Sequence, residues 1–184
     1  MFKRRTPLNV FQKLKELAWP SMGWGRMGVY LKHRTIRIPD SNYKIALGLA
    51  LGAAISFSPF VFTHIIQGCI LAFFLRANYI AVAIGTLIGN PWTFPFMWWA
   101  GISLGAGIFN WLGFPASTNV PDAMSLEIFI NLIKNDPFRI LFPWMLGGYL
   151  ICLVTLPLFY ILFYQIVKGA KAARAIKRKK ETQS

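Results

Sequence analysis

Two side chains that can carry charge stand within a largely uncharged part of the chain. His64 lies in residues 45–75, which contain no Asp, Glu, Lys or Arg, and Arg76 separates that block from the uncharged residues 77–121. Ionisable groups at membrane depth are costly and usually functional. A guanidinium offers paired donors to a phosphate or carboxylate, and an imidazole can relay protons. Both residues are therefore candidate contacts for an anionic substrate.

Each candidate also has a structural interpretation, and the sequence leaves both open. His64 could donate a hydrogen bond to a carbonyl group at a helix break, and Arg76 could be an anchor that reaches the membrane interface. Three polar residues complete the candidate substrate-binding set. Asn78 and Asn90 are expected to cap helices, and Thr93 could line the same cavity or bond a carbonyl group of its own helix.

No catalytic arrangement accompanies these residues. The sequence contains no HExxH, GxSxG, CxxC or Gly-rich phosphate loop, and all six acidic residues lie outside the uncharged blocks. The only histidines, His33 and His64, are far apart in the sequence. We therefore predict no enzyme activity, no catalytic residue, no metal site and no cofactor.

The elements that position the candidates are predicted from three uncharged blocks, residues 45–75, 77–121 and 140–167. Each block exceeds the roughly 20 apolar residues that cross a bilayer as a helix. A soluble core would show amphipathic stripes instead. The sequence thus predicts an all-α, polytopic integral membrane protein with about four membrane segments.

Prolines interrupt two of these segments. The breaks are predicted at Ser58 and Pro59 and at Pro91 and Pro95, because proline removes a helical hydrogen bond and clashes with the preceding turn. Unpaired backbone groups at a break must be buried in protein or line a watery cavity. We therefore expect one or two broken or re-entrant helices.

The breaks recur at an offset of 32 residues. A basic residue, Lys44 or Arg76, opens each window, and a polar residue before proline, Ser58 or Asn90, ends its apolar stretch. Paired breaks in two repeats indicate a transporter binding site. Chance alignment among 11 prolines is the alternative.

Pairs of glycines at GxxxG spacing accompany the breaks. They predict close approach of helix backbones. The pairs are Gly48/Gly52, Gly85/Gly89 and Gly101/Gly105.

The net charge of +14 is concentrated at the two ends of the chain. Residues 1–43 are expected to form a basic cytoplasmic or interfacial region, with an amphipathic helix at 8–18, and residues 168–184 a polybasic cytoplasmic tail. At the end of the first region, Asp40-Ser41-Asn42 are expected to supply the N-cap of the helix that follows. The membrane domain would be 44–167, with 113–139 as a non-cytoplasmic loop. This positive-inside pattern places both termini in the cytoplasm and makes anionic lipid headgroups, not nucleic acid, the expected partner. A homo-oligomer is left open.

An ordered set of short motifs runs through the first two blocks. It consists of Ser56-Phe57-Ser58-Pro59-Phe60, His64, Leu75-Arg76-x-Asn78, Gly85-Thr86 and Gly89-Asn90-Pro91-x-Thr93-Phe94-Pro95. This set resembles the bacterial membrane-protein family catalogued as domain of unknown function 2062, in its alphaproteobacterial form. The resemblance implies a fold and an inner-membrane location but no activity. Phe62 departs from the family, which tends to carry glycine there.

These features predict an uncharacterised multi-pass protein of the bacterial inner membrane. The leading hypothesis is a small transporter or lipid-handling protein that binds an anionic group at its broken helices. The alternative is a membrane scaffold or assembly factor that recruits partners through its basic termini.

Overall fold

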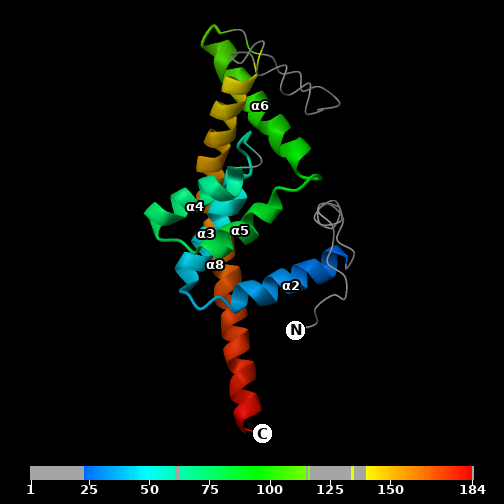
Figure 1. Ribbon diagram of the computed structural model, residues 1–184, viewed down its shortest axis with the longest axis vertical. Coiled ribbons are helices and arrows are strands. Elements are labelled where there is room, and N and C mark those ends of the chain that lie inside the picture. The colour runs from blue at the N-terminus through cyan, green and yellow to red at the C-terminus, as the bar shows by residue number, and fades with distance from the viewer. Residues whose placement is uncertain (1–22, 61–62, 115, 117–133, 135–139, 184) are drawn as a thin grey trace. The chain divides into compact units, whose positions relative to one another are not determined.

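The computed structural model describes residues 23–60, 63–114, 116, 134 and 140–183. These described residues form six α-helices and one short 3-10 helix, with no strand among them (Figure 1). The predicted all-α class is confirmed. The chain divides after Ile38 into two units, and each is described by itself.

The first unit contains one described helix, α2 (Trp24–Ile36). It begins after Gly23, which has a positive φ of 80°, and carries His33 and Arg34 in its last turn, where cations favour the helix dipole. The predicted helix at 8–18 and nearly all of the predicted loop at 113–139 lie outside the described residues.

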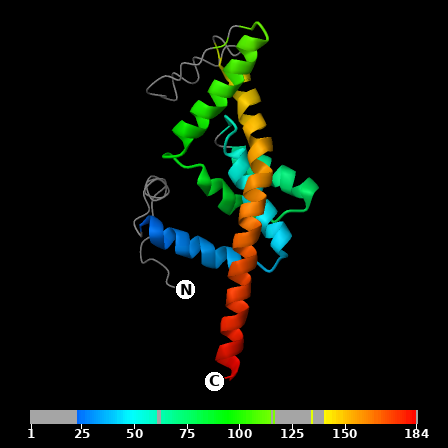
Figure 2. The same cartoon turned by 180° about the vertical axis from the view of Figure 1, so that it is seen from behind.

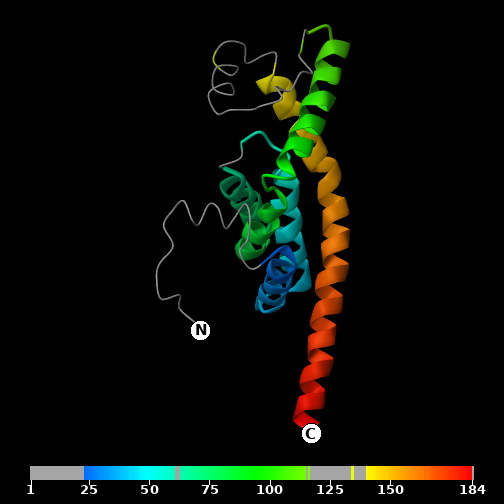
Figure 3. The same cartoon turned by 90° about the vertical axis from the view of Figure 1, so that its right-hand side faces the viewer.

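The second unit holds the remaining helices in a fixed order. They are α3 (Asn42–Ile55), α4 (His64–Leu75), α5 (Tyr79–Gly85), the 3-10 helix η2 (Thr86–Ile88), α6 (Phe94–Trp111) and α8 (Leu141–Gln183). The long helix α8 packs against both α3 and α6, as Figures 2 and 3 show from two sides.

Local sequence explains where α3 starts and stops. The Ser41 side chain accepts a hydrogen bond from the backbone N–H of Lys44 at 3.3 Å, which confirms the predicted N-cap. The helix ends at Ile55, and Pro59 disfavours helical backbone at Ser58. α3 is apolar around its whole circumference, and every residue from 45 to 55 is buried.

α4 returns antiparallel along α3. Gly68 of α4 lies beside Ile55, near the end of α3, whereas Ala72 packs with Leu47 and Leu51, nearer its start. α5 instead runs parallel to α3. α3 therefore contacts two helices, α4 and α5, that run in opposite directions.

Glycines set the separation between α3 and α5. A methyl group on Gly48 would clash with Ala81, and one on Gly52 would clash with the backbone of Val82. Gly85 of α5 lies equally close to the backbone of Leu49 on α3. The prediction that these glycines allow close backbone approach is confirmed.

The same principle joins α6 to α8. A methyl group on Gly105 would clash with the backbone of Pro143, and one on Gly147 would clash with the carbonyl oxygen of Gly101. Trp144 fills the space beside Gly101. α6 and α8 therefore run antiparallel, with backbones in contact.

The second halves of the two sequence windows pack differently. α4 returns along α3, whereas α6, which follows α5 and η2, packs on α8. The windows therefore share a helix followed by a break, but not the arrangement that follows it.

Large apolar side chains lie on the outside of the second unit. Ile66, Phe73 and Phe74 on α4 and Leu153 and Leu158 on α8 are each more than half exposed. Within the described residues, one helix, over Leu141–Ile176, is long and apolar enough to cross a membrane by length and composition.

Candidate functional site

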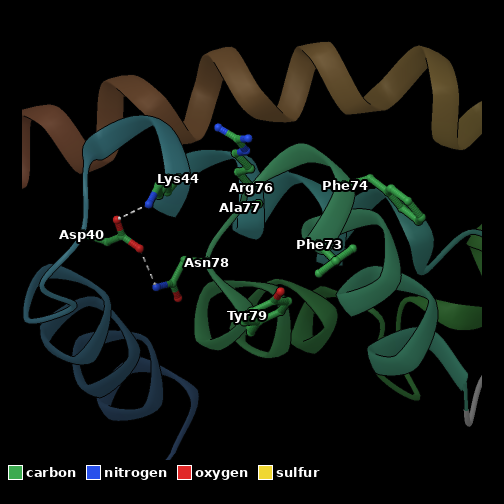
Figure 4. A pocket seen from close by; sticks show the side chains of 8 residues that line it. All are labelled: Asp40, Lys44, Phe73, Phe74, Arg76, Ala77, Asn78 and Tyr79. Atoms are coloured by element: carbon green, nitrogen blue, oxygen red, sulfur yellow. Dashed lines mark hydrogen bonds and ion pairs between the residues drawn. The ribbon is translucent and has the colours of Figure 1, made fainter.

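A pocket opens where the start of α3, the end of α4 and the start of α5 meet (Figure 4). Its volume is about 630 Å³. The lining residues are Asp40, Lys44, Phe73, Phe74, Arg76, Ala77, Asn78 and Tyr79. Two of the predicted substrate-binding residues, Arg76 and Asn78, are thus brought together.

Arg76 ends α4 in the left-handed conformation, with a φ of 54°. Its N–H donates to the Phe73 carbonyl at 3.4 Å, and the Ala77 N–H donates to the Ala72 carbonyl at 2.8 Å. This closure normally uses glycine, because other residues are strained there by about 1–2 kcal/mol. Among the described non-glycine residues, only Arg76 has a positive φ.

Asp40 connects the starts of α3 and α5. Its Oδ2 accepts a hydrogen bond from Asn78 Nδ2 at 3.1 Å, and its Oδ1 lies 3.4 Å from Lys44 Nζ. The Ser41 N–H also donates to Oδ1, at 3.0 Å. The hydrogen bond from Asn78 is the largest of the effects that lower the pKa of the Asp40 carboxyl, while partial desolvation opposes them.

Asn78 uses its side chain and backbone for the fold. Its Oδ1 accepts a hydrogen bond from the Ala81 N–H at 3.0 Å, which confirms the predicted helix cap. Its own N–H donates to the Lys44 carbonyl at 3.0 Å. From α8, Lys171 Nζ donates to the Asp40 carbonyl at 2.6 Å. Asn78 therefore positions the pocket and has little capacity left for a ligand.

Arg76 differs from its neighbours in the pocket. Its side chain is exposed, and its guanidinium has no hydrogen-bond or ion-pair partner among the described residues. Figure 4 shows it pointing away from the pair formed by Asp40 and Asn78. Lys44, Arg76 and Lys171 bring three positive charges against the one carboxylate, which leaves a local excess of +2.

The first break is closed by a buried histidine. His64, the first residue of α4, is 4% exposed, and its Nε2 lies 3.0 Å from the Ser58 carbonyl oxygen. Because a carbonyl oxygen only accepts, the ring nitrogen is the donor. This is the contact expected of the structural interpretation of His64.

Side chains within the second break form hydrogen bonds with its own backbone groups. Asn90 Oδ1 accepts hydrogen bonds from the N–H groups of Trp92 and Thr93 at 2.9 and 3.2 Å. Thr93 Oγ1 donates to the Ile88 carbonyl at 2.6 Å. The polar groups of Asn90 and Thr93 are thus engaged within one turn.

Pro95 does not interrupt a helix, although the sequence suggested a break there. It lies in the first turn of α6, between Phe94 and Phe96. The first N–H groups of a helix have no partner within it, so proline loses no hydrogen bond at this position. Pro59 and Pro91, by contrast, lie in the connections between helices.

The two breaks lie against each other. A methyl group on Gly89 would lie 2.8 Å from both the Ser56 side chain and the Phe94 ring. The rings of His64 and Phe94 are 5.9 Å apart. Ser56 and Ser58 are fully buried. The breaks therefore pack against each other, with Ser56 and Ser58 buried at the contact and Pro91 and Trp92 exposed.

The predicted contacts fall into two groups rather than one site. Arg76 and Asn78 lie at the C-terminal end of α4, whereas His64 starts that helix, about 18 Å away at 1.5 Å per residue. Asn90 and Thr93 belong to the second break. A single small anion does not reach Arg76 and His64 together, which corrects that part of the prediction.

Sequence reasoning missed the other six lining residues and also Lys171, which supports them. The six are Asp40, Lys44, Phe73, Phe74, Ala77 and Tyr79. One signal was present for Lys44, because it matches Arg76 in the 32-residue offset, and both line the pocket. Asp40 was recognised only as part of a helix cap. Its contact with Asn78 spans 38 residues and has no local signature.

Comparison with known proteins gives one match. The family model described as "Uncharacterized protein conserved in bacteria (DUF2062)" matches residues 25–175. No curated protein and no solved structure matches the chain.

Proposed function

The chain belongs to the bacterial DUF2062 family, and on that premise we propose that it is an inner-membrane protein that binds an anionic group at the Arg76 pocket. Within this proposal it is a small transporter or a lipid-handling protein. The observation that carries it is the guanidinium of Arg76, which lines the pocket from a strained backbone position and has no partner within the part of the chain that the structure describes.

Burial in the second unit supports the membrane setting. Small residues such as Ala46, Ala50 and Ala53 are buried at its helix contacts beside larger ones, while many other Ile, Leu and Phe side chains face outward. Exposure of such an apolar surface to water costs free energy, whereas exposure to lipid does not. Small residues at helix contacts are typical of membrane proteins, because lipid provides no hydrophobic drive for association.

Tyrosines mark one membrane interface at the level of the pocket. The ring of Tyr160 lies 5.9 Å from that of Tyr43 and 5.8 Å from that of Tyr164. Lys44 follows Tyr43 in the sequence, and Lys171 lies after Tyr164 on α8. Both lysines contact Asp40. Aromatic and basic residues together are typical of the interface on the cytoplasmic side.

The helix directions support four membrane segments and two full crossings. α3 and α4 form a re-entrant hairpin whose ends both lie at the pocket. α5, η2 and α6 form one broken crossing, and α8 returns. Both termini are then cytoplasmic, as the positive-inside pattern predicts.

Single-cysteine labelling in a Cys69→Ala/Cys152→Ala background tests this arrangement. Cysteines that replace Tyr43 and Tyr79 should react with an impermeant reagent from the cytoplasmic side only, and one that replaces Trp111 from the opposite side. Labelling of positions 43 and 79 from opposite sides would eliminate the re-entrant hairpin.

Reconstitution into liposomes tests function. Phospholipid scrambling and phosphate flux are measured for the wild type, Arg76→Gly, Arg76→Lys and the distant control Lys179→Ala. We expect one activity to be lost in Arg76→Gly, partly kept in Arg76→Lys and unchanged in the control. Equal activity in all four proteins would refute a role for the Arg76 pocket.

The scaffold alternative makes a different prediction. Truncation after residue 174 removes much of the basic tail but keeps Lys171, which contacts Asp40. A scaffold should lose function in cells through this truncation and tolerate Arg76→Gly. The anion-binding proposal expects the reverse.

A further inference from the structure

We infer that the anion at Arg76 is the headgroup of an anionic phospholipid whose acyl chain lies along the exposed face of α4. This inference rests on the proposed function and names its ligand class. It follows from the surroundings of the guanidinium rather than from the guanidinium itself.

The pocket has one cationic side and one aromatic side. Lys44 and Arg76 provide the charge, while Phe73, Phe74 and Tyr79 form the aromatic part, all five lining one pocket (Figure 4). Phe73 and Phe74 are each more than half exposed. A free phosphate would leave these rings uncovered, whereas an amphiphile would cover them and pair with the charge.

The apolar side continues beyond the pocket. Ile66, Ile70 and Phe74 recur at intervals of four residues, so they lie in one row on α4, and each is more than half exposed. The row is about 12 Å long at 1.5 Å per residue. It starts beside Arg76 and runs away from the interface, as an acyl chain must.

The charge balance selects among lipids. The local excess of +2 from Lys44, Arg76 and Lys171 against Asp40 attracts a phosphate that carries a net negative charge. A choline headgroup brings its own cation, which this excess repels. The inferred ligand is therefore an anionic glycerophospholipid rather than a zwitterionic one.

The experiment compares three probes on the full-length protein in a mild detergent. The probes are phosphatidylglycerol, phosphatidylcholine and soluble glycerol 3-phosphate, and binding is measured by native mass spectrometry and by displacement of a fluorescent lipid. The variants are Arg76→Gly, the double variant Ile66→Ala/Ile70→Ala and a matched control on α8, Leu153→Ala/Leu158→Ala.

We expect phosphatidylglycerol to bind at least tenfold more tightly than the other two probes. Arg76→Gly should weaken that binding about tenfold, which corresponds to 1.4 kcal/mol. The double variant on α4 should weaken it severalfold, and the control on α8 should leave it unchanged.

The remaining outcomes separate the two proposals. If glycerol 3-phosphate binds as tightly as the lipid and with the same dependence on Arg76, the lipid inference is wrong and anion binding stands. Equal effects of the α4 and α8 double variants would also overturn the acyl-chain path. If no probe depends on Arg76, both proposals fail.

Discussion

The Asp40 carboxylate accepts a hydrogen bond from Asn78 Nδ2 at 3.1 Å, although 38 residues separate the two. Asp40 precedes α3 and Asn78 caps α5, so the contact joins the starts of two parallel helices. Lys171 extends the junction to α8 through the Asp40 carbonyl. Arg76 lies in the short segment between α4 and α5, next to this junction. The junction fixes the backbone of Arg76, while the side chain of Arg76 stays exposed.

The junction predicts a pH dependence of stability. The folded-state pKa of Asp40 is lowered, chiefly by the hydrogen bond from Asn78. The ionised carboxylate therefore stabilises the fold above the unfolded-state pKa of about 3.9, and this stabilisation is lost as pH falls through the folded-state value. Thermal unfolding in detergent between pH 6 and pH 3 should show it.

Asp40→Asn is the matched variant for that experiment. It should be less stable than the wild type at pH 6, and the difference should shrink towards pH 3. A constant difference across this range would show that the Asp40 charge contributes nothing to the fold.

Two glycines on α6 provide a packing test within one helix. A methyl group on Gly105 would clash with the backbone of Pro143, whereas one on Gly107 meets nothing within 4 Å. Gly105→Ala should therefore destabilise the protein by about 1–3 kcal/mol or more, as overpacking does. Gly107→Ala should be neutral or slightly stabilising, because alanine favours helix.

Unfolding of the two alanine variants in the same detergent gives the comparison. Similar midpoints for Gly105→Ala and Gly107→Ala would mean that α6 and α8 do not pack through Gly105.

His64 is predicted to stabilise the break rather than to contact the anion. His64→Ala would leave the buried Ser58 carbonyl without its donor, at a cost of about 1–3 kcal/mol. His64→Gln should restore part of that stability, because its amide can donate. Lipid binding at Arg76, at the opposite end of α4, should persist in both variants.

A proton relay at His64 would give a different pattern. His64→Ala would then fold with nearly normal stability and lose transport, and His64→Gln would not rescue it. The two sets of results separate the alternatives that the sequence leaves open.

Local signals predicted much of the fold. The caps at Ser41 and Asn78 and the close packing at Gly48 and Gly105 depend on residue type and short spacing, and the structure confirms them. The number of crossings was less accessible, because a proline marks a break but not the direction in which the chain continues.

The candidate site was predictable only in part. Arg76 was identified by its isolation among apolar residues, but its left-handed backbone and the pocket around it depend on tertiary packing. The sequence placed His64 at the same site, because it did not show that one uninterrupted helix, α4, separates His64 from Arg76. That helix places His64 at the first break and Arg76 at the pocket.

We propose that Arg76 occupies a position suited to glycine because its side chain binds an anionic lipid. Glycine adopts the φ of 54° without strain, so Arg76→Gly should not destabilise the fold and can stabilise it by up to about 1 kcal/mol. A ligand that binds only the folded protein raises its unfolding temperature. Removal of the guanidinium should abolish that rise.

Thermal unfolding of wild type and Arg76→Gly, each with and without phosphatidylglycerol, measures both effects together. We predict that Arg76→Gly unfolds at an equal or higher temperature without lipid and gains no stability when lipid is added, whereas the wild type does. A variant that unfolds earlier than the wild type and gains as much from the lipid would contradict this role of Arg76.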